Sequence, residues 1–356
     1  MRVLLLNRYN VQGASSRLRT LQYVNGLEQR GFKIDVHHLF GSDYLDHLYT
    51  GAALPLRSIV AAYFQRAAFA LRGGNWDLLW VEKELLPWIP AWLETFLLNK
   101  GTTLVLDYDD ATFHRYDQHH NPWIRSLLGS KITRLMHRAS LVIVGNPYLA
   151  EYAQQAGASR IEIVPTAVDT NRYAPRDTTR ANETFVVGWI GTPYTARYLK
   201  NIASALRELQ DSGPVEFHFI GAPEGLDLGI TYQARPWSEE SEVHELQQLD
   251  CGIMPLDDDP FERGKCGYKI VQYFACGVPV VASPVGVNKD IVIPGENGFL
   301  AVDDVTWLSH LKMLRDDVSL AQRLGEKGRS MIEQRYSTEL TLNRIEAFLR
   351  SVVDRN

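Results

Sequence analysis

Short apolar segments alternate with amphipathic, helix-like stretches along most of the chain. Six segments of the first half have the apolar character of buried strands, namely 3–6, 33–39, 77–81, 103–108, 141–145 and 161–165. Amphipathic stretches lie between them, at 16–30, 122–138 and 148–155. Because strands that are apolar on both faces must be covered on both faces, this alternation predicts a parallel sheet wrapped by helices.

The same pattern restarts in the second half. Strand-like segments occur at 185–191, 215–221, 251–256 and 278–283, with helical patterns near 196–210, 239–248 and 268–275. A polar, turn-rich stretch at 169–183 separates the halves and is interpreted as a linker. The predicted fold class is α/β, with two Rossmann-like, doubly wound domains at 1–170 and 184–336. A C-terminal helix within 337–356 is expected to pack back on the first domain.

Composition limits the class of protein. An apolar fraction of 45% and a charged fraction of 22% are typical of a globular chain of two domains. The three cysteines include no CxxC pair, so neither a disulfide framework nor a zinc site is expected, and a cytoplasmic location fits. The N-terminal apolar run is too short for a signal peptide, and no run of about 18 apolar residues predicts a membrane span.

Charge is unevenly distributed. Residues 1–180 contain 20 Lys and Arg against 16 Asp and Glu, whereas residues 181–356 contain 17 against 26. One interpretation is chance; the other is that the first half meets an anionic membrane surface or a phosphorylated acceptor. Aromatic stretches at 57–72 and 84–98 fit either a membrane interface or an ordinary core.

Two loops of the first half carry groups suited to chemistry. Gly13 permits a tight turn after the first strand, although an ordinary βα turn explains it equally well, and no GxGxxG fingerprint follows. Asp107, Asp109 and Asp110 end the strand at 103–108, and mutual repulsion is expected to raise their pKa values. Such carboxylates suit base catalysis or sugar-hydroxyl binding; a solvated loop is the alternative, and no metal site is expected. His114 is a weaker acid/base candidate.

Two loops of the second half suit an anion. Gly191 and Thr192 break a strand, Thr195 is expected to cap the next helix, and Arg197 and Lys200 add positive charge. The alternative is a capped turn with surface cations.

The other anion candidate lies at 261–286, where Lys265 and Lys269 stand at a predicted helix start and Gln272 follows one turn later. Cations oppose the dipole there, so their presence indicates a bound phosphate or diphosphate, with solvated lysines as the alternative.

Four segments, at 164–175, 188–199, 250–288 and 294–301, resemble glycosyltransferase family 4, the retaining GT-B enzymes of bacterial polysaccharide and lipid-linked glycan synthesis. The resemblance implies two domains facing across a cleft, a nucleotide-diphosphate sugar bound mainly by the second, and an acceptor hydroxyl bound mainly by the first. It implies no required cofactor, a glycan or lipid-linked acceptor, peripheral association with the cytoplasmic membrane face, and no nucleic-acid partner.

The resemblance assigns roles to particular positions. On the donor side they are Gly191, Thr192, Arg197, Lys265, Lys269 and Gln272, and on the acceptor side Gly13, Arg17, Asp109 and Asp110. Asp110, Lys269 and Glu262 are the expected catalytic residues. Trp237 is expected either to wall the nucleotide base or to be core.

The chain departs from the family where many members carry two glutamates eight residues apart. Gly264 and Gln272 occupy those positions, and Glu262 is the nearest carboxylate. Trp189 and its following turn also replace a usual arginine. These departures keep two alternatives open, a GT-B nucleotide-sugar epimerase and a non-catalytic carbohydrate- or nucleotide-binding scaffold. A nicotinamide dehydrogenase is disfavoured by the missing glycine fingerprint.

Overall fold

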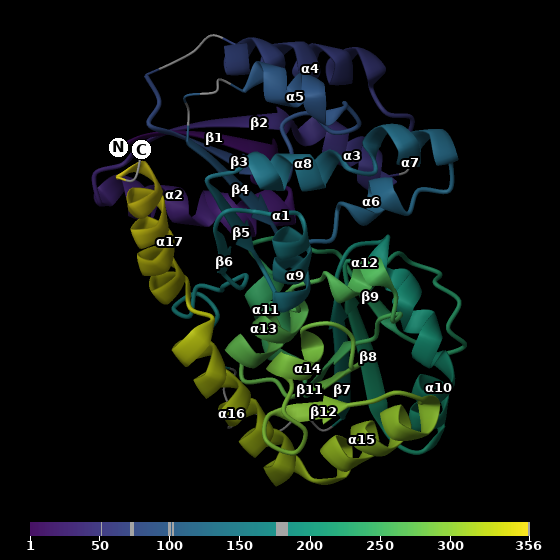
Figure 1. The fold of residues 1–356 in the computed structure, drawn as a ribbon. Helices are drawn as coiled ribbons and strands as arrows, with labels where there is room; N and C mark the ends of the chain where they lie inside the picture. The colour runs from purple at the N-terminus through teal and green to yellow at the C-terminus, as the bar shows by residue number, and fades with distance from the viewer. Residues whose placement is uncertain (51, 72–74, 99–100, 102, 176–183, 355–356) are drawn as a thin grey trace. The chain divides into compact units, whose positions relative to one another are not determined.

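The chain folds into two compact units, each built on its own parallel sheet (Figure 1). The computed structural model describes residues 1–50, 52–71, 75–98, 101, 103–175 and 184–354. Most of the predicted linker, residues 176–183, lies outside the described residues. The first unit comprises Met1–Thr166, Arg263–Cys266 and Glu339–Asn356, and the second comprises Ala167–Glu262 and Gly267–Thr338.

The first unit contains a six-stranded sheet of order β2-β1-β3-β4-β5-β6, in which every pair is parallel. Its strands are β1 (Arg2–Tyr9), β2 (Lys33–Phe40), β3 (Leu78–Glu82), β4 (Thr103–Tyr108), β5 (Leu141–Val144) and β6 (Ile161–Ile163). Its helices are α1 (Ala14–Ser16), η1 (Arg17–Leu21), α2 (Gln22–Gln29), α3 (Ser42–Thr50), α4 (Leu56–Leu71), α5 (Ala91–Leu97), α6 (His114–Asp117), α7 (Pro122–Leu128), α8 (Lys131–Arg138), α9 (Pro147–Gln155) and α17 (Thr338–Val353).

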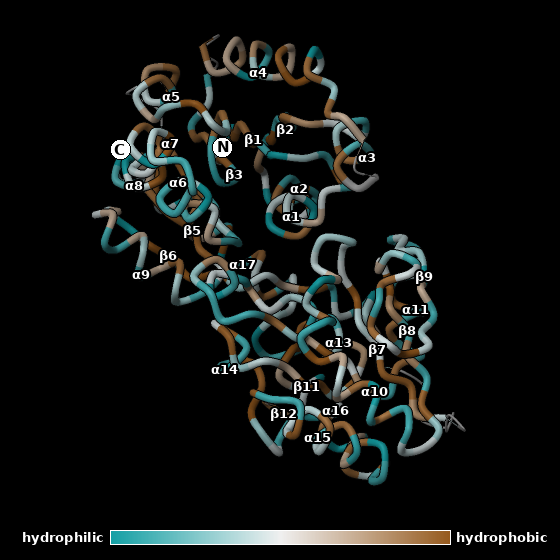
Figure 2. Tube along the Cα trace, turned by 90° about the vertical axis from the view of Figure 1, so that its right-hand side faces the viewer, coloured by the Kyte–Doolittle hydropathy of each residue, from teal (hydrophilic) through white to brown (hydrophobic). Residues whose placement is uncertain are grey.

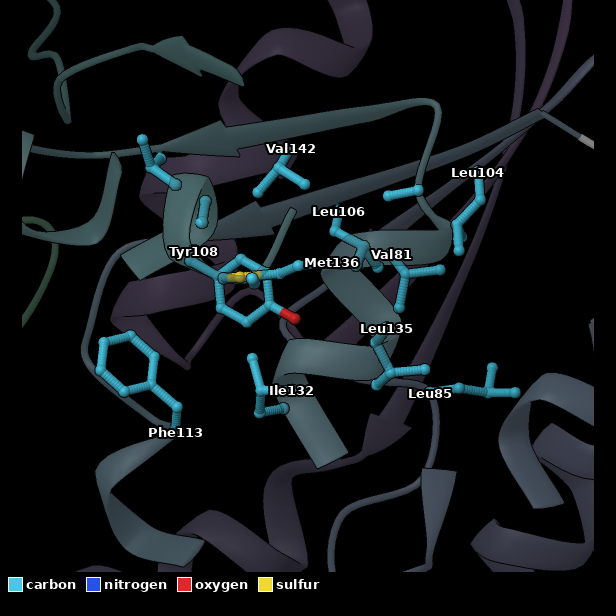
Figure 3. Packing of buried hydrophobic residues seen from close by; sticks show 14 of the residues in the cluster. Val81, Leu85, Leu104, Leu106, Tyr108, Phe113, Ile132, Leu135, Met136 and Val142 are labelled. Atoms are coloured by element: carbon cyan, nitrogen blue, oxygen red, sulfur yellow. The ribbon is translucent and has the colours of Figure 1, made fainter. Parts of the chain in front are cut away.

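Alternate residues of β1 enter cores on opposite faces of this sheet. Leu4 and Leu6 belong to the cluster shown in Figure 3, which surrounds Tyr108 and is covered by α8. Val3 and Leu5 belong to a second cluster, which α2 and α17 cover. A strand places successive side chains on opposite faces, so the segment 3–6 of β1 must be apolar at every position, as the sequence predicts.

The C-terminal helix is part of the first unit's core. Ile345 and Leu349 of α17 lie in the same cluster as the strand residues of β1. Gly26 of α2 approaches α17 so closely that an added Cβ would overlap the Leu342 side chain. Arg30 also forms an ion pair with Glu346, at 2.7 Å between Nη1 and Oε2. The last helix therefore packs on strands that are more than 300 residues earlier in the chain.

The second unit contains a six-stranded parallel sheet of order β12-β11-β10-β7-β8-β9. Its strands are β7 (Phe185–Ile190), β8 (Val215–Ile220), β9 (Gln233–Arg235), β10 (Cys251–Met254), β11 (Val280–Ala282) and β12 (Gly298–Leu300). Its helices are η2 (Thr195–Ile202), α10 (Ala203–Asp211), α11 (Glu242–Gln247), α12 (Pro260–Arg263), α13 (Tyr268–Ala275), α14 (Asn288–Ile291), α15 (Asp304–Asp316) and α16 (Val318–Arg335). Strands β9 and β12, at the two edges, are absent from the sequence prediction.

One predicted helical stretch is divided in the structure. The amphipathic pattern at 122–138 forms two helices, α7 and α8, which are separated at Gly129 and Ser130. Asn121 caps the first helix by accepting a hydrogen bond from the Trp123 backbone N–H at 2.9 Å. The predicted amphipathic stretch is therefore helical, but as two helices.

Candidate functional site

Each sheet has one point where the direction of winding reverses. In the first unit the chain leaves β1 for β2 on one side and returns to place β3 on the other. In the second unit β8 lies on one side of β7 and β10 on the other. Ligands of doubly wound sheets bind outside the carboxyl ends of the strands at such reversals. Candidate sites therefore lie at the carboxyl ends of β1 and β3 in the first unit, and of β7 and β10 in the second.

The turn after β7 requires a glycine because of close packing. A Cβ added to Gly191 would overlap the Trp189 ring and lie 2.8 Å from Thr195 Oγ1. Thr192 N–H donates to that hydroxyl at 3.1 Å. The prediction that Thr195 caps the next helix is wrong, because its side chain closes this turn and η2 begins without a side-chain cap.

Helix α13 begins next to this turn. Its start follows Gly267, whose φ of +66° is a left-handed backbone conformation that suits glycine. The Tyr273 hydroxyl accepts a hydrogen bond from Ile190 N–H at 3.0 Å, which fixes the helix to the end of β7. Lys269 Nζ lies 5.6 Å from the centroid of the Trp189 ring, within the range of a cation–π contact. The structure thus brings together Gly191, Trp189 and Lys269, three positions that the sequence marks separately.

Gln272 belongs to a buried polar group on the same helix. It is 4% exposed, and its Nε2 donates to the Tyr173 hydroxyl at 3.3 Å. Tyr173 in turn donates to Glu242, which also accepts from Trp237 Nε1 at 2.6 Å. Burial and the Glu242 carboxylate raise the pKa of Tyr173, so its hydroxyl keeps its proton. Trp237 is partly buried against the core of the second unit, with its indole nitrogen engaged.

Glu262 is a buried anchor within the second unit. Its side chain is 2% exposed, and it accepts a hydrogen bond from the Tyr198 hydroxyl. Arg197 Nη2 lies 3.5 Å from Glu262 Oε1, and its guanidinium lies 4.3 Å from the Tyr194 ring centroid. The carboxylate therefore positions Arg197, whose own side chain is 47% exposed.

Gly264 stands where many family members have their first glutamate, and it has no room for a side chain. A Cβ there would lie 2.5 Å from the Ala111 Cβ and 2.7 Å from the Ala111 backbone nitrogen. Asn146 Nδ2 donates to the carbonyls of Gly264 at 2.8 Å and of Lys265 at 3.0 Å. This segment clusters with the first unit, so Lys265 and Lys269 belong to different units.

Asp109 and Asp110 of the first unit lie beside a buried lysine at the end of β3. Lys83 Nζ is 2.8 Å from Asp109 Oδ1 and 3.5 Å from Asp110 Oδ2, and Ser15 donates to Asp109. Burial alone would raise the pKa of Asp109, but the Lys83 ammonium and the Ser15 hydroxyl lower it to about 2. The expected rise through mutual repulsion is therefore wrong for Asp109.

Asp107 behaves differently from its neighbour. Burial raises its pKa to about 6, although Arg19 Nε lies 2.8 Å from Oδ1 and opposes this shift. Arg19 also donates to the Val164 carbonyl at 2.7 Å. This pair is buried inside the first unit, where it joins β4 to the segment after β6.

The remaining predicted residues of the first unit support its loops. A Cβ on Gly13 would overlap Tyr9, so the turn after β1 needs glycine there. Arg17 Nη1 donates to the Val11 carbonyl at 3.2 Å, within the same loop. His114 has both ring nitrogens engaged, Nδ1 2.9 Å from Asp117 Oδ1 and Nε2 2.8 Å from the Tyr148 hydroxyl.

Sequence reasoning missed two cations of this region, Arg8 and Lys83. Both lie near the carboxyl ends of strands at the reversal point, Arg8 in β1 and Lys83 directly after β3. The available signal for Lys83 was the charged run at 82–84 at the end of a buried strand, because charged residues are almost never buried unless they are paired. Over the described part of the chain, no group of three or more His, Cys, Asp or Glu residues could hold a metal ion.

Substituting Gly191 by alanine tests the expectation that the turn after β7 binds the nucleotide of a donor. The added methyl group must displace Trp189 or Thr195, at a cost of about 1–3 kcal/mol for overpacking. We expect nucleotide affinity to fall roughly tenfold, the equivalent of about 1.4 kcal/mol. Calorimetric titration measures it, and Gly41→Ala, which would meet no atom within 4 Å, is the control. Equal affinities in wild type and Gly191→Ala would exclude this turn from the site.

Comparisons with known proteins indicate a related family and a shared fold. The sequence profile of the family described as "Glycosyl transferases group 1" matches residues 184–317, which include the β7 turn and α13. A protein of Bacillus subtilis (strain 168) named as teichuronic acid biosynthesis glycosyltransferase TuaH is 24% identical over 178 residues. That match covers 45% of this chain and 44% of the relative, so it spans less than half of either protein.

Two solved structures share the whole fold. Sucrose-phosphate synthase from Thermosynechococcus elongatus superposes with a TM-score of 0.75 at 15% identity, with 100% of both chains covered. HepE from Anabaena, solved in complex with UDP-glucose, superposes with a TM-score of 0.71 at 17% identity, covering 99% of this chain and 100% of that one. The protein therefore has the GT-B fold, and its residues 184–317 are similar to the family described as "Glycosyl transferases group 1".

Proposed function

We propose that the protein is a retaining glycosyltransferase that transfers a sugar from a nucleotide-diphosphate sugar to an acceptor hydroxyl. The observation that carries this proposal is the placement of Lys269 beside Trp189 and Gly191 at the winding reversal of the second sheet. A lysine at a helix start, next to a glycine turn, suits a diphosphate. HepE, which shares the fold, is solved with UDP-glucose.

On this proposal the second unit holds the donor. Lys269 and Arg197 would stabilise the charge of the departing diphosphate, whereas Lys265 belongs to the first unit. Gly191 and Thr192 would form the turn against which the diphosphate rests, whereas Gln272 is buried and bonded to Tyr173, so it would support the site without contacting the ribose. Glu262 would act through Arg197, because its carboxylate contacts that guanidinium and the Tyr198 hydroxyl.

The first unit would hold the acceptor through Gly13, Arg17, Asp109 and Asp110. In the transfer, the bond between the anomeric carbon and the diphosphate oxygen breaks, and a bond from that carbon to the acceptor oxygen forms on the same face. The acceptor proton passes to an oxygen of the departing diphosphate. Asp110 would orient the acceptor hydroxyl, since its partner Lys83 is shared with the more deeply buried Asp109. Charge stabilisation of the leaving group is the largest contribution expected from the protein.

Nucleotide specificity tests the donor assignment. UDP-, GDP-, TDP- and ADP-sugars are each added to the full chain, and the thermal unfolding midpoint is followed. A ligand at 100 times its Kd stabilises the folded state by about 2.7 kcal/mol, which is readily measured. The proposal predicts stabilisation by at least one of these donors. If none of the four donors raises the unfolding midpoint, the assignment of a donor site is wrong.

We further propose that the acceptor belongs to surface polysaccharide or glycolipid synthesis and that the protein docks on the cytoplasmic face of a membrane. Helix α4 exposes Leu56, Val60, Phe64 and Leu71, three of them at four-residue spacing on one face. The neighbouring α5 exposes Trp92 and Phe96, which are 65% and 77% exposed. The hydrophobic colouring of α4 is visible in Figure 2.

This apolar face suits an interfacial contact. Exposed aromatic and aliphatic side chains on adjacent helices bury their surface between lipid headgroups, and the exposed Arg57 of α4 adds attraction to anionic lipids. Among the described helices, none is long and apolar enough to cross a membrane. The proposed mode of association is therefore docking of the α4–α5 face.

The double variant Phe64→Ser/Phe96→Ser tests this docking. Removing two exposed phenylalanines lowers the apolar area that enters the interface, so binding to anionic phosphatidylglycerol vesicles should weaken roughly tenfold or more. Co-sedimentation with vesicles measures the effect. The control is Val305→Ser/Val318→Ser, which removes two exposed apolar residues of the second unit. Unchanged sedimentation of the phenylalanine variant would exclude the α4–α5 face as the docking surface.

A further inference from the structure

The first unit has a cavity of about 170 Å³ at the point where β1 and β3 end. Three of its lining residues are cations, Arg8, Lys83 and Arg115, and only Asp110 among the lining residues is a carboxylate. All of them lie within the first unit, so the cavity is complete there. An engineered cavity of ~150 Å³ binds benzene, so this one has room for a six-membered ring or its charged substituent.

Arg8 is held at the cavity with unused hydrogen-bonding capacity. Its residue is 9% exposed, and its Nε has no hydrogen-bond partner. Its nearest carboxylate, on Glu84, is 3.6 Å from Nη1, and that carboxylate is already engaged by Lys131 at 2.6 Å. A buried donor without a partner lowers the stability of the fold by about 1–3 kcal/mol. A ligand that accepts the Arg8 Nε–H hydrogen bond explains why such a donor is kept at a cavity wall.

Lys83 reaches the same cavity through an unusual backbone conformation. Its φ is +63, which is uncommon for a residue other than glycine and is found mainly where the surroundings impose it. Its backbone N–H donates to the Asp107 carbonyl at 2.8 Å, and Nζ donates to Ser15 Oγ at 2.9 Å. The strand end is thus bent so that the ammonium group faces the loops after β1 and β4.

The lining itself carries three cations and one carboxylate. Asp109 and Asp110 both pair with Lys83, and the Glu84 carboxylate lies 3.6 Å from Arg8 Nη1. A neutral sugar would need carboxylates and amides to accept its hydroxyl protons, whereas this wall offers mostly donors.

We propose that this cavity binds an anionic group of the acceptor, a carboxylate or a phosphate ester, next to the hydroxyl that is glycosylated. The inference rests on the proposed glycosyltransferase function and narrows its acceptor to a charged glycan or a phosphorylated carrier. Arg8 and Arg115 provide planar guanidinium groups, which bind either anion through two parallel hydrogen bonds. Asp110, at the same wall, is left to contact the neighbouring hydroxyl.

The test compares three small probes on the full chain: glucuronate, glucose 6-phosphate and neutral glucose. Calorimetry or ligand-observed NMR gives the affinities, and the first two probes separate a carboxylate from a phosphate ester. At least one anion should bind ten times or more tighter than glucose. Arg115→Gln should abolish that preference, whereas Arg134→Gln, an exposed arginine on α8 outside the lining, should keep it.

The outcomes separate this inference from the function on which it rests. Equal binding of glucose and both anions, or an anion preference that survives Arg115→Gln, would overturn the anionic subsite. If the chain binds a nucleoside diphosphate but neither anion, the anionic subsite is also overturned. The proposed transferase function is unaffected by that result. Anion binding that depends on Arg115, in a chain that binds none of UDP, GDP, TDP or ADP, would overturn the proposed function and leave the subsite.

Discussion

Replacement of Lys269 by alanine is expected to reduce sugar transfer by roughly 10²–10³-fold, the effect of removing one preorganised group that stabilises developing charge. The ammonium lies at the start of α13, 5.6 Å from the Trp189 ring centroid, next to the turn at Gly191. On a departing diphosphate it would act more strongly in the transition state than in the bound donor. The loss should therefore appear mainly in kcat, with a smaller change in KM.

The fold of the Lys269→Ala variant should be preserved. Lys269 is partly exposed, and a lysine in the first turn of a helix opposes the helix dipole, so its removal does not weaken α13. Lys327→Ala removes the same charge from an exposed position on α16 and should retain full turnover. Unchanged kcat in Lys269→Ala, with a working donor and acceptor, would show that this lysine has no part in the chemistry.

Replacement of Lys131 by methionine is expected to destabilise the first unit by about 3–5 kcal/mol, because it removes the ammonium group that two buried carboxylates share. Lys131 Nζ lies 2.6 Å from Glu84 Oε2, 2.7 Å from Glu94 Oε1 and 2.7 Å from the Leu86 carbonyl. These contacts fix the segment between β3 and α5, which begins with Lys83. Denaturant unfolding measures the loss, and Lys327→Met should change the free energy of unfolding by less than about 0.5 kcal/mol.

The same variant should depend on pH in a defined direction. Burial raises the pKa of Glu94 to about 7, so the folded protein holds this proton at a pH where an unfolded glutamic acid has lost it. The stability from that proton is fully present below the unfolded pKa and is lost as pH rises through 7. Lys131 lowers the pKa of Glu94, so its removal favours the protonated carboxyl, and Lys131→Met should be less destabilised at pH 5 than at pH 8. A loss that is equal at both values, or absent, would contradict the buried charge network.

The fold was predictable where strands are apolar on both faces. All ten strands that the sequence predicts are present, from β1 to β11, because their buried sides leave a clear signal. Strand β9 was missed because its sequence, QAR, is polar, and β12 because its three residues, GFL, follow a turn-rich stretch; the equally short edge strand β6 was predicted from the apolar run IEIVP. Edge strands carry half the burial of central ones, so their pattern is weak.

The site residues could be predicted only where a single short segment of the sequence marks them. Gly191 and Lys269 stand out in their own loops, and the structure places both beside Trp189. The cavity formed by Arg8, Lys83 and Arg115 draws on three separate segments, which meet because β1 and β3 are neighbours in the sheet. The order of strands in a sheet cannot be read from any one segment, so this cluster could not be predicted from the spacing of residues in the sequence.

The most direct test of the central claim is mass spectrometry of the products formed from a nucleotide sugar and an acceptor. The chain is incubated with a donor that stabilises it, with glycan and lipid-linked acceptors that carry or lack an anionic group. The account predicts an acceptor heavier by one sugar residue, with release of an equal amount of nucleoside diphosphate and the anomeric configuration of the donor retained. Nucleotide release without any glycosylated product, or an isomerised donor with an unmodified acceptor, would contradict it.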